Sequence, residues 1–382
     1  MNGGFTAGVA IAGVGDVDYG KLYENRYPKP PRDAYALAVE AFKNALDDCG
    51  MKKEEIDGIL CVRDVNNYEE CCCRLGIRQP RLVNLIEGAG RMSGVSLQYA
   101  AMAIKTGMCK NVLIIYGNNG RSVGDNYGSN GSGADRYGYV HGMTSPGAQV
   151  SAMFNRYRHL YGITEEQFAK VAMSNRYHAS LNPKAIMRKR FTLEEYLNTR
   201  YITEPLRLYD YALINDGAVA MILTSVEHAK DLKKPVVEIL SSSVCGDMTP
   251  SYLKEDFFFE ATRKVAADVY GAAGLTPKDI DCLQLYDNFT PTMLFELEGL
   301  GFCDRGEAGG YIDSVGISLG SRCPVNTHGG HTSESYMQGF GHHVEAVRQL
   351  RHECGERQVP DCEVAQFVIS SPIISSHILV RR

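Results

Sequence analysis

Residues that can move protons or stabilise negative charge gather near the C-terminal end, in the segment NTHGGHTSESYMQGFG. Tyr336 is the candidate general acid or base, because a phenol with a pKa of about 10 transfers protons when nearby donors stabilise its anion. His328 and His331 flank two adjacent glycines, and we expect both histidines to contact substrate. Gly329 and Gly330 let the backbone approach a ligand closely, so they predict either an oxyanion hole or a tight turn.

A second group of candidates stands at the end of an apolar strand in the sequence LQLYDNFT. Ligand sites in α/β proteins usually form where strands end. Asp287 is therefore a candidate base, or a residue that orients Tyr336 or a histidine. The adjacent Asn288 is a second catalytic candidate, ranked below Asp287. The alternative is that Asp287 caps the helix that begins at TPTMLFELEGLG. His342 and His343 begin the last helix and are not assigned to the site.

The elements that must position these residues are repeated along the chain. Helical patterns end in glycine at Gly50 and Gly274, each followed by a polar turn and an apolar strand. Gly274 lies 224 positions after Gly50, and the same offset pairs Asp57 with Asp281. Helix–strand alternation in both copies predicts a duplicated α/β fold with α-β-α-β-α layers. We expect one half at residues 1–230 and the other at 231–382.

The first half carries an insertion at about residues 118–203 that has no counterpart in the second. It starts with a segment rich in Gly, Asn and Ser. Long loops are often active-site covers, although a plain surface loop fits equally well. Arg121 and His141, near the two ends of this Gly-rich segment, are candidate substrate or CoA ligands.

Composition restricts the class of protein. The 382 residues are 44% hydrophobic and 22% charged with a net charge of −5, so nucleic acid is not an expected partner. Apolar runs are far shorter than the roughly 20 residues of a membrane span, and no signal peptide is evident. The twelve cysteines form no paired C-x-x-C motif, so we expect no metal site and a reducing, cytoplasmic location.

Four blocks together resemble the thiolase superfamily over essentially the whole chain, in its sterol carrier protein X-type, lipid-transfer-protein-like branch. They are YVHGMTSPGAQVSAMFNRYRHLYG, EPLRLYDYALINDGAVAMILTS, LYDNFTPTMLFELEGLGFCDRGEAGGYI and PVNTHGGHTSESYMQGFG. Within that branch the chain is most similar to the CoA-thioester aldolases of steroid side-chain degradation. The resemblance implies a coenzyme A thioester as substrate, no tightly bound cofactor, and a homodimer that joins small zinc-ribbon/OB-fold subunits in a heterotetramer.

The chain departs from thiolases at the residues that their chemistry requires. Arg91 or Met92 stands where the resemblance places the nucleophilic cysteine, Tyr336 replaces a histidine, and FVISSPIISS lacks the second cysteine. Ser93 and Gly94 begin the helix whose positive end can still stabilise an anion. The resemblance also points to a second catalytic tyrosine near Tyr252.

Three functions remain open from the sequence. The first is cleavage or formation of a carbon–carbon bond β to a bulky acyl-CoA thioester, by a retro-aldol route without an acyl-cysteine. The second is a thiolase-type reaction such as that of benzoylsuccinyl-CoA thiolase in anaerobic toluene degradation. The third is a non-catalytic subunit that binds acyl-CoA or lipid, or that scaffolds a partner.

Overall fold

A mixed sheet of nine strands forms the centre of the fold. The computed structural model describes residues 4, 6, 8–24, 32–124, 140–249 and 254–382. The strand order is β3-β2-β4-β7-β1-β8-β11-β10-β9. The strands are β1 (Val9–Asp16), β2 (Gly58–Arg63), β3 (Leu82–Ile86), β4 (Val112–Asn118), β7 (Gly217–Ser225), β8 (Val237–Gly246), β9 (Cys282–Leu285), β10 (Val364–Ile369) and β11 (Ile373–Arg381). A small separate pair is formed by β5 (Tyr201–Thr203) and β6 (Leu206–Arg207).

The two halves of the sheet meet where β1 pairs with β8 in antiparallel fashion, at Val9↔Ile239 and Ala10↔Glu238. Outward from this line the order is β1, β7, β4, β2 on one side and β8, β11, β10, β9 on the other. Each half thus repeats the same pattern of antiparallel and parallel neighbours. This correspondence supports a proposed division of the chain near residue 230.

Equivalent residues make equivalent contacts in the two halves. Asp57 accepts a hydrogen bond from the backbone N–H of Asn111 at 2.8 Å, and Asp281 accepts one from Val364 at 2.9 Å. Each carboxylate ties the start of one strand to the start of its parallel neighbour. The spacing in the sequence therefore corresponds to a repeated structural device.

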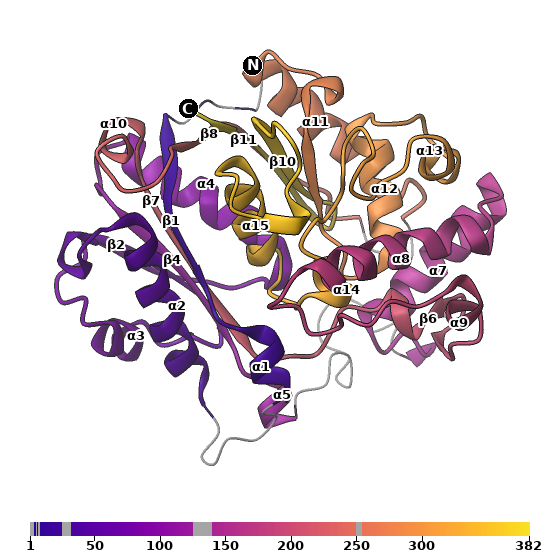
Figure 1. The fold of residues 1–382 in the computed structure, drawn as a ribbon, viewed down its shortest axis with the longest axis horizontal. Helices are drawn as coiled ribbons and strands as arrows, with labels where there is room; N and C mark the ends of the chain where they lie inside the picture. The colour runs from indigo at the N-terminus through magenta and orange to yellow at the C-terminus, as the bar shows by residue number, and fades with distance from the viewer. Residues whose placement is uncertain (1–3, 5, 7, 25–31, 125–139, 250–253) are drawn as a thin grey trace.

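Helices form three layers around the two half-sheets (Figure 1). Helix α2 packs on the first half and α11 on the second, whereas α4 and α15 each contact strands of both halves. The α-β-α-β-α order expected from the sequence is therefore present. The bounds are α1 (Tyr19–Glu24), α2 (Ala34–Cys49), α3 (Tyr68–Leu75), α4 (Met92–Lys105), α10 (Val226–Ala229), α11 (Phe259–Ala273), α12 (Thr290–Leu300), α13 (Ala308–Ser314), α14 (Gly330–Ser333) and α15 (Phe340–Leu350).

The insertion at about 118–203 is largely helical in its described part rather than one long loop. It contains α5 (Gly120–Val123), α7 (Pro146–Tyr161), α8 (Glu165–Leu181) and α9 (Leu193–Leu197). Helix α8 packs against α12, α13 and α14, so the insertion of the first half covers part of the second. The Gly-rich stretch at 125–139 lies outside the described residues.

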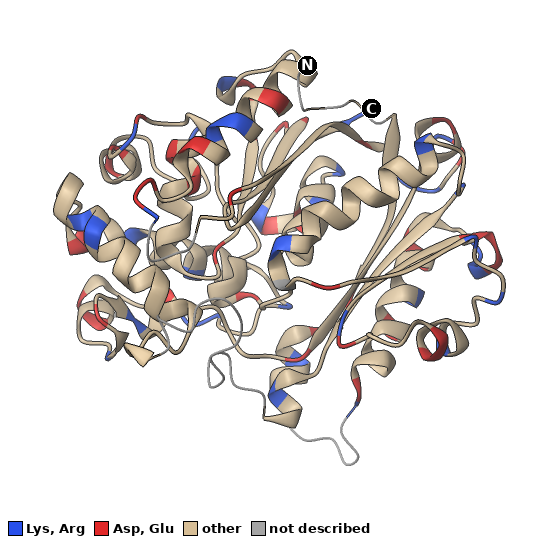
Figure 2. Cartoon of the chain, turned by 180° about the vertical axis from the view of Figure 1, so that it is seen from behind, with Lys and Arg blue, Asp and Glu red and all other residues tan. Residues whose placement is uncertain are grey.

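Charged side chains of both signs are interspersed over the outer helices and loops (Figure 2). Among the described residues, no helix is long and apolar enough to span a membrane. The apolar side chains fill the layers between helices and strands, which leaves the polar clusters described next as the buried exceptions.

Candidate active site

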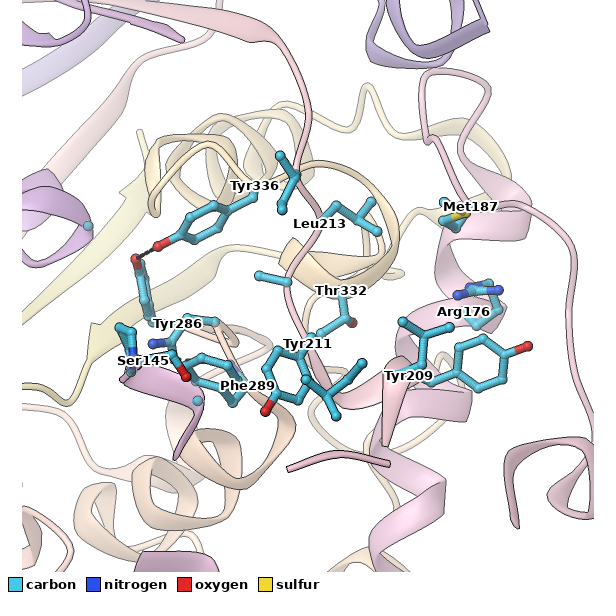
Figure 3. A pocket seen from close by; sticks show the side chains of 18 of the residues that line it. Ser145, Arg176, Met187, Tyr209, Tyr211, Leu213, Tyr286, Phe289, Thr332 and Tyr336 are labelled. Carbon is cyan, nitrogen blue, oxygen red and sulfur yellow. Dashed lines mark hydrogen bonds between the residues drawn. The ribbon is translucent and has the colours of Figure 1, made fainter. Parts of the chain in front are cut away.

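An elongated pocket of about 910 Å³ lies between the insertion and the ends of the central strands. Tyr286 and Tyr336 stand at one end, and Arg176, Met187 and Tyr209 at the other (Figure 3). Much of the wall between them is apolar. The apolar lining residues include Phe191, Ile202, Leu208, Tyr211, Leu213, Ile214 and Phe289.

Tyr286 and Tyr336 form a hydrogen-bonded pair, with 3.1 Å between their hydroxyl oxygens. Tyr286 directly follows β9, and its N–H donates to Val368 of the neighbouring strand. Tyr336 lies in the loop between α14 and α15, where its N–H donates to the Asn215 side chain at 2.7 Å. Two separate elements thus bring two phenols together at the end of the pocket.

Tyr286 was not identified from the sequence. Its hydroxyl lies so close to Gly90 that a Cβ on Gly90 would meet the oxygen at 1.5 Å. Gly90 directly precedes Arg91 and Met92, one of which stands where the resemblance to thiolases places the nucleophile. The Tyr286 hydroxyl therefore occupies space beside the start of α4.

The surroundings of the two phenols differ. Burial raises the pKa of Tyr286 well above its usual value, and the neighbouring Tyr336 adds to this rise. Burial also raises the pKa of Tyr336, but hydrogen bonds from Tyr286 and Gln338 and the charges of Arg63 and Arg91 oppose it. Negative charge is therefore better tolerated on Tyr336 than on Tyr286.

Two of these neighbours have unusual backbone conformations. Arg63 (φ 66°) and Gln338 (φ 50°) lie in the left-handed region, which non-glycine residues rarely adopt. Such strain often accompanies functional sites, because the surrounding structure must impose it. Here Arg63, through its charge, and Gln338, through a hydrogen bond, both stabilise negative charge on Tyr336.

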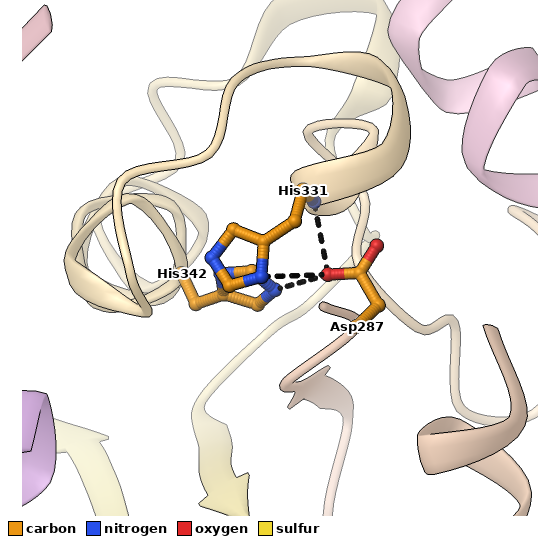
Figure 4. A group of neighbouring side chains, drawn as sticks. All are labelled: Asp287, His331 and His342. Carbon is orange, nitrogen blue, oxygen red and sulfur yellow. Dashed lines mark hydrogen bonds and ion pairs between the residues drawn. The ribbon is translucent and has the colours of Figure 1, made fainter. Parts of the chain in front are cut away.

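Asp287 lies behind the tyrosine pair with a fully buried carboxylate. It accepts the backbone N–H of His331 at 2.9 Å, and its Oδ1 lies 3.0 Å from His342 Nε2 and 3.3 Å from His331 Nδ1 (Figure 4). Asn175 donates to the other oxygen at 2.8 Å. The expected cap of α12 is therefore wrong, because Asp287 caps the short helix α14 instead.

His331 links this carboxylate to both tyrosines. Its ring lies edge-on to Tyr286 and to Tyr336, with centroid distances of 4.7 and 4.9 Å. Its Nε2 accepts the backbone N–H of Gly339 at 2.9 Å, which closes the loop that carries Tyr336. His331 thus supports Tyr336 from behind rather than lining the pocket.

Asp287, His331 and His342 also have the spacing of a metal site, with one possible ligand atom from each within 4.8 Å of the others. The hydrogen bonds argue for a different use. Burial lowers the pKa of His331 well below its usual value, so its ring is neutral. Because Nε2 accepts the Gly339 N–H, the single ring proton resides on Nδ1, which lies 3.3 Å from Asp287 Oδ1. That nitrogen has no lone pair for a metal.

The two glycines predicted to form an oxyanion hole face the protein interior. A Cβ on Gly329 would lie 2.6 Å from Ala179 Cβ, and one on Gly330 would lie 2.2 Å from Asp287 Oδ2. The Gly329 N–H already donates to the Asn326 carbonyl. Both residues have positive φ, so the turn and the close packing account for them.

The remaining predicted residues are divided between the pocket and other places. Asn288 and Arg121 line the pocket, and Arg121 stacks on Tyr23 with 3.6 Å from its guanidinium carbon to the ring centroid. His328 is buried beside Glu334, 3.7 Å from Nε2 to the carboxylate. His141 is exposed and does not line the pocket.

Two predicted residues lie under the start of α4, and one lies outside the described part. Ser93 is buried and donates to the Gly90 carbonyl at 3.1 Å, and Gly94 packs against Ser375 and His377. Neither lines the pocket. Tyr252 falls outside the described residues, so its assignment stays a prediction.

Comparison with known proteins agrees with this architecture. A family described as thiolase C-terminal domain-like matches residues 248–380. A 17-hydroxy-3-oxo-4-pregnene-20-carboxyl-CoA lyase of Mycobacterium tuberculosis is 37% identical over 359 residues, covering 90% of this chain and 91% of the relative. A steroid side-chain-cleaving aldolase of Thermomonospora curvata is 35% identical, covering 90% of each chain. The chain belongs to the thiolase superfamily.

Solved structures place it in the aldolase branch of that superfamily. The Ltp2-ChsH2(DUF35) aldolase superposes with a TM-score of 0.88 at 32% identity, covering 99% of this chain and 98% of the other. Human mitochondrial 3-ketoacyl-CoA thiolase with CoA gives 0.71 at 15% identity, covering 99% of each chain, which shows the shared fold alone. The chain is thus a thiolase-superfamily acyl-CoA lyase of the aldolase type, as the sequence predicted.

Proposed function

We propose that this protein cleaves a β-hydroxyacyl-CoA by a retro-aldol reaction in which Tyr336 and Tyr286 relay the proton. The observation that carries the proposal is the 3.1 Å hydrogen bond between the two hydroxyls at the end of the pocket. No cysteine is among the described residues that line this pocket. A thiolase-type acyl-cysteine route, the main alternative, therefore has no nucleophile in the described pocket wall.

The relay balances protons without leaving a phenolate. Tyr336 takes the proton of the substrate β-hydroxyl as the bond between the α- and β-carbons breaks and the β-carbon becomes a ketone. Tyr336 passes its own proton to Tyr286, and Tyr286 gives its proton to the α-carbon of the departing thioester enolate. Both phenols end protonated, which agrees with the raised pKa values that burial imposes on them. Tyr336 takes the base position because Gln338, Arg63 and Arg91 favour negative charge there.

The other end of the pocket suits the nucleotide part of coenzyme A. Lys189 and Arg190 line it, and among the described residues neither forms an ion pair with a carboxylate. Arg176 is already held by the Ser333 hydroxyl and the Lys189 carbonyl, so its guanidinium is fixed in place. Cations at one end and phenols at the other orient an acyl-CoA with its thioester toward Tyr286.

The apolar middle of the pocket fits a bulky acyl group, and the relatives direct us to a steroid. Aromatic and aliphatic residues such as Phe191, Tyr211 and Phe289 form this part of the wall. By similarity to the Ltp2-ChsH2(DUF35) aldolase, we further propose a DUF35-type partner subunit. A homodimer of this chain at the centre of the complex stays a prediction from the resemblance to thiolases.

The test uses 17-hydroxy-3-oxo-4-pregnene-20-carboxyl-CoA, the substrate named by one relative. Co-expressed chain and DUF35-type subunit are expected to release the 17-ketosteroid and propanoyl-CoA, both measured by mass spectrometry. The same complex should not use free CoA to cleave a 3-ketoacyl-CoA. Thiolytic cleavage with no release of ketone from the hydroxyacyl substrate would refute the retro-aldol assignment.

A further inference from the structure

Arg91 lies at the end of the pocket that holds the two phenols. It lines the wall together with Gly90, Tyr286 and Tyr336. Among the described residues no hydrogen bond or ion pair engages its guanidinium, although its charge acts on Tyr336. A cation beside two phenols in a half-enclosed pocket is positioned to meet an anion that forms during the reaction.

The position of Arg91 is fixed from two sides. It is the N-cap residue of α4, and Gly90 just before it packs against the Tyr286 hydroxyl so closely that no Cβ fits. In the proposed relay, Tyr286 delivers its proton to the α-carbon. The thioester oxygen is bonded to the adjacent carbonyl carbon, so its ligand must lie near the Tyr286 hydroxyl, and Arg91 directly follows the glycine on which that hydroxyl packs.

We infer that Arg91 is a catalytic residue that binds the oxygen of the thioester enolate. The inference rests on the proposed retro-aldol function and adds the group that carries the developing charge. When the bond between the α- and β-carbons breaks, its electron pair moves into the enolate, and the negative charge settles on the thioester oxygen. A guanidinium offers two N–H donors and a full positive charge to that oxygen.

A guanidinium also explains how the site works without the glycine pair. Gly329 and Gly330 pack against Ala179 and Asp287, and neither lines the pocket. Arg91 therefore binds the oxyanion, the role that the sequence had suggested for those two glycines.

A binding measurement tests the inference separately from turnover. Carboxymethyl-CoA is an anionic analogue of the thioester enolate, with its carboxylate one carbon further from the sulfur than the enolate oxygen-bearing carbon, and S-(2-oxopropyl)-CoA has the same shape without the charge. Wild-type protein should prefer the anionic compound, and Arg91→Gln should reduce that preference by about 10- to 100-fold in isothermal titration calorimetry, as expected for loss of a charged hydrogen bond. Arg91→Lys should retain part of the preference because it keeps the charge.

The matched control is Arg190→Gln, which removes a cation from the other end of the same pocket. It should weaken both CoA compounds equally and raise KM, whereas Arg91→Gln should lower kcat by about 100-fold with little change in KM. If Arg91→Gln leaves the preference unchanged, or weakens both compounds as Arg190→Gln does, Arg91 is not the enolate ligand. If Arg91→Gln loses the preference for the anionic compound but the wild-type complex cleaves no hydroxyacyl-CoA, the proposed function is overturned instead.

Discussion

The hydroxyl oxygen of Tyr286 rests directly on Gly90, where a Cβ would meet it at 1.5 Å. This contact sets the distance between the phenol and the first turn of α4, and it makes glycine obligatory at position 90. The site thus depends on a residue that carries no functional group of its own.

Gly90→Ala should therefore abolish catalysis while the fold survives. The added methyl group must push the Tyr286 hydroxyl away and break its hydrogen bond to Tyr336, so we expect kcat to fall by at least about 100-fold. Gly310→Ala is the control, because its Cβ would meet only the end of the Glu307 side chain, at 3.5 Å. Lyase assays and thermal unfolding of both variants make the comparison; equal activity in the two would contradict the packing argument.

Removal of either phenol should stop the relay without loss of acyl-CoA binding. Tyr286→Phe and Tyr336→Phe each delete one oxygen of the 3.1 Å pair, and we expect kcat to fall by about 10²- to 10⁴-fold. Their affinity for S-(2-oxopropyl)-CoA should stay within about threefold of wild type by calorimetry, since neither contact is to the nucleotide. Substantial turnover by either variant would show that the phenols do not act as a relay.

The Asp287 cluster should hold no metal ion. His331 Nε2 is occupied by the Gly339 N–H, so the ring proton is on Nδ1, 3.3 Å from the carboxylate. We expect the isolated chain to contain no stoichiometric metal by mass spectrometry and to keep its Tm after dialysis against a chelator. The cluster would be a metal centre if the wild-type chain contained one equivalent of metal that the chelator removed and that the His342→Ala variant did not contain.

Glu334 should make the folded state less stable as pH rises from 4.5 to about 8. Burial, with Glu345 and Asp16 nearby, raises the pKa of Glu334 from 4.5 to about 8. The folded protein therefore holds one more proton than the unfolded chain between pH 4.5 and about 8. Across that window stability falls with rising pH, by up to about 1.4 kcal/mol per pH unit.

Glu334→Gln removes this titration while keeping an oxygen for the Asn182 side chain, which donates to Glu334 at 2.8 Å. Its unfolding free energy, measured in urea from pH 5 to pH 8, should depend less on pH than that of wild type. Asp313→Asn is the control, because an ion pair with Lys170 lowers the pKa of that carboxylate and moves its own window below pH 4. Identical slopes for wild type and Glu334→Gln would assign the dependence to other groups.

Much of the fold could be predicted because its signals are local. Asp33 caps α2 and Gly50 ends it in the left-handed conformation, as the sequence pattern indicated. The internal match of Asp57 with Asp281 predicted the duplication, and both carboxylates make the same contact. Helix capping and hydrophobic periodicity depend on residues that are close together in the sequence, so one sequence is enough to recognise them.

The site was only partly predictable because its contacts are not local. Tyr336 was identified, but Tyr286 reads as one more aromatic residue at a strand end, and only the fold places its hydroxyl against Gly90. His342 was set aside as a helix start with no role, yet it is fully buried. Its helix α15 lies between two half-sheets, so even its polar residues face protein on both sides.

The described pocket wall contains no cysteine, and this changes the conditions under which such a protein can work. A thiolate nucleophile is lost to peroxide or to an alkylating agent, because the same electron pair that attacks a thioester also attacks oxidants. Two phenols and a guanidinium are inert to both. The chemistry of this pocket is therefore compatible with oxidising conditions that would inactivate an acyl-cysteine thiolase of the same fold.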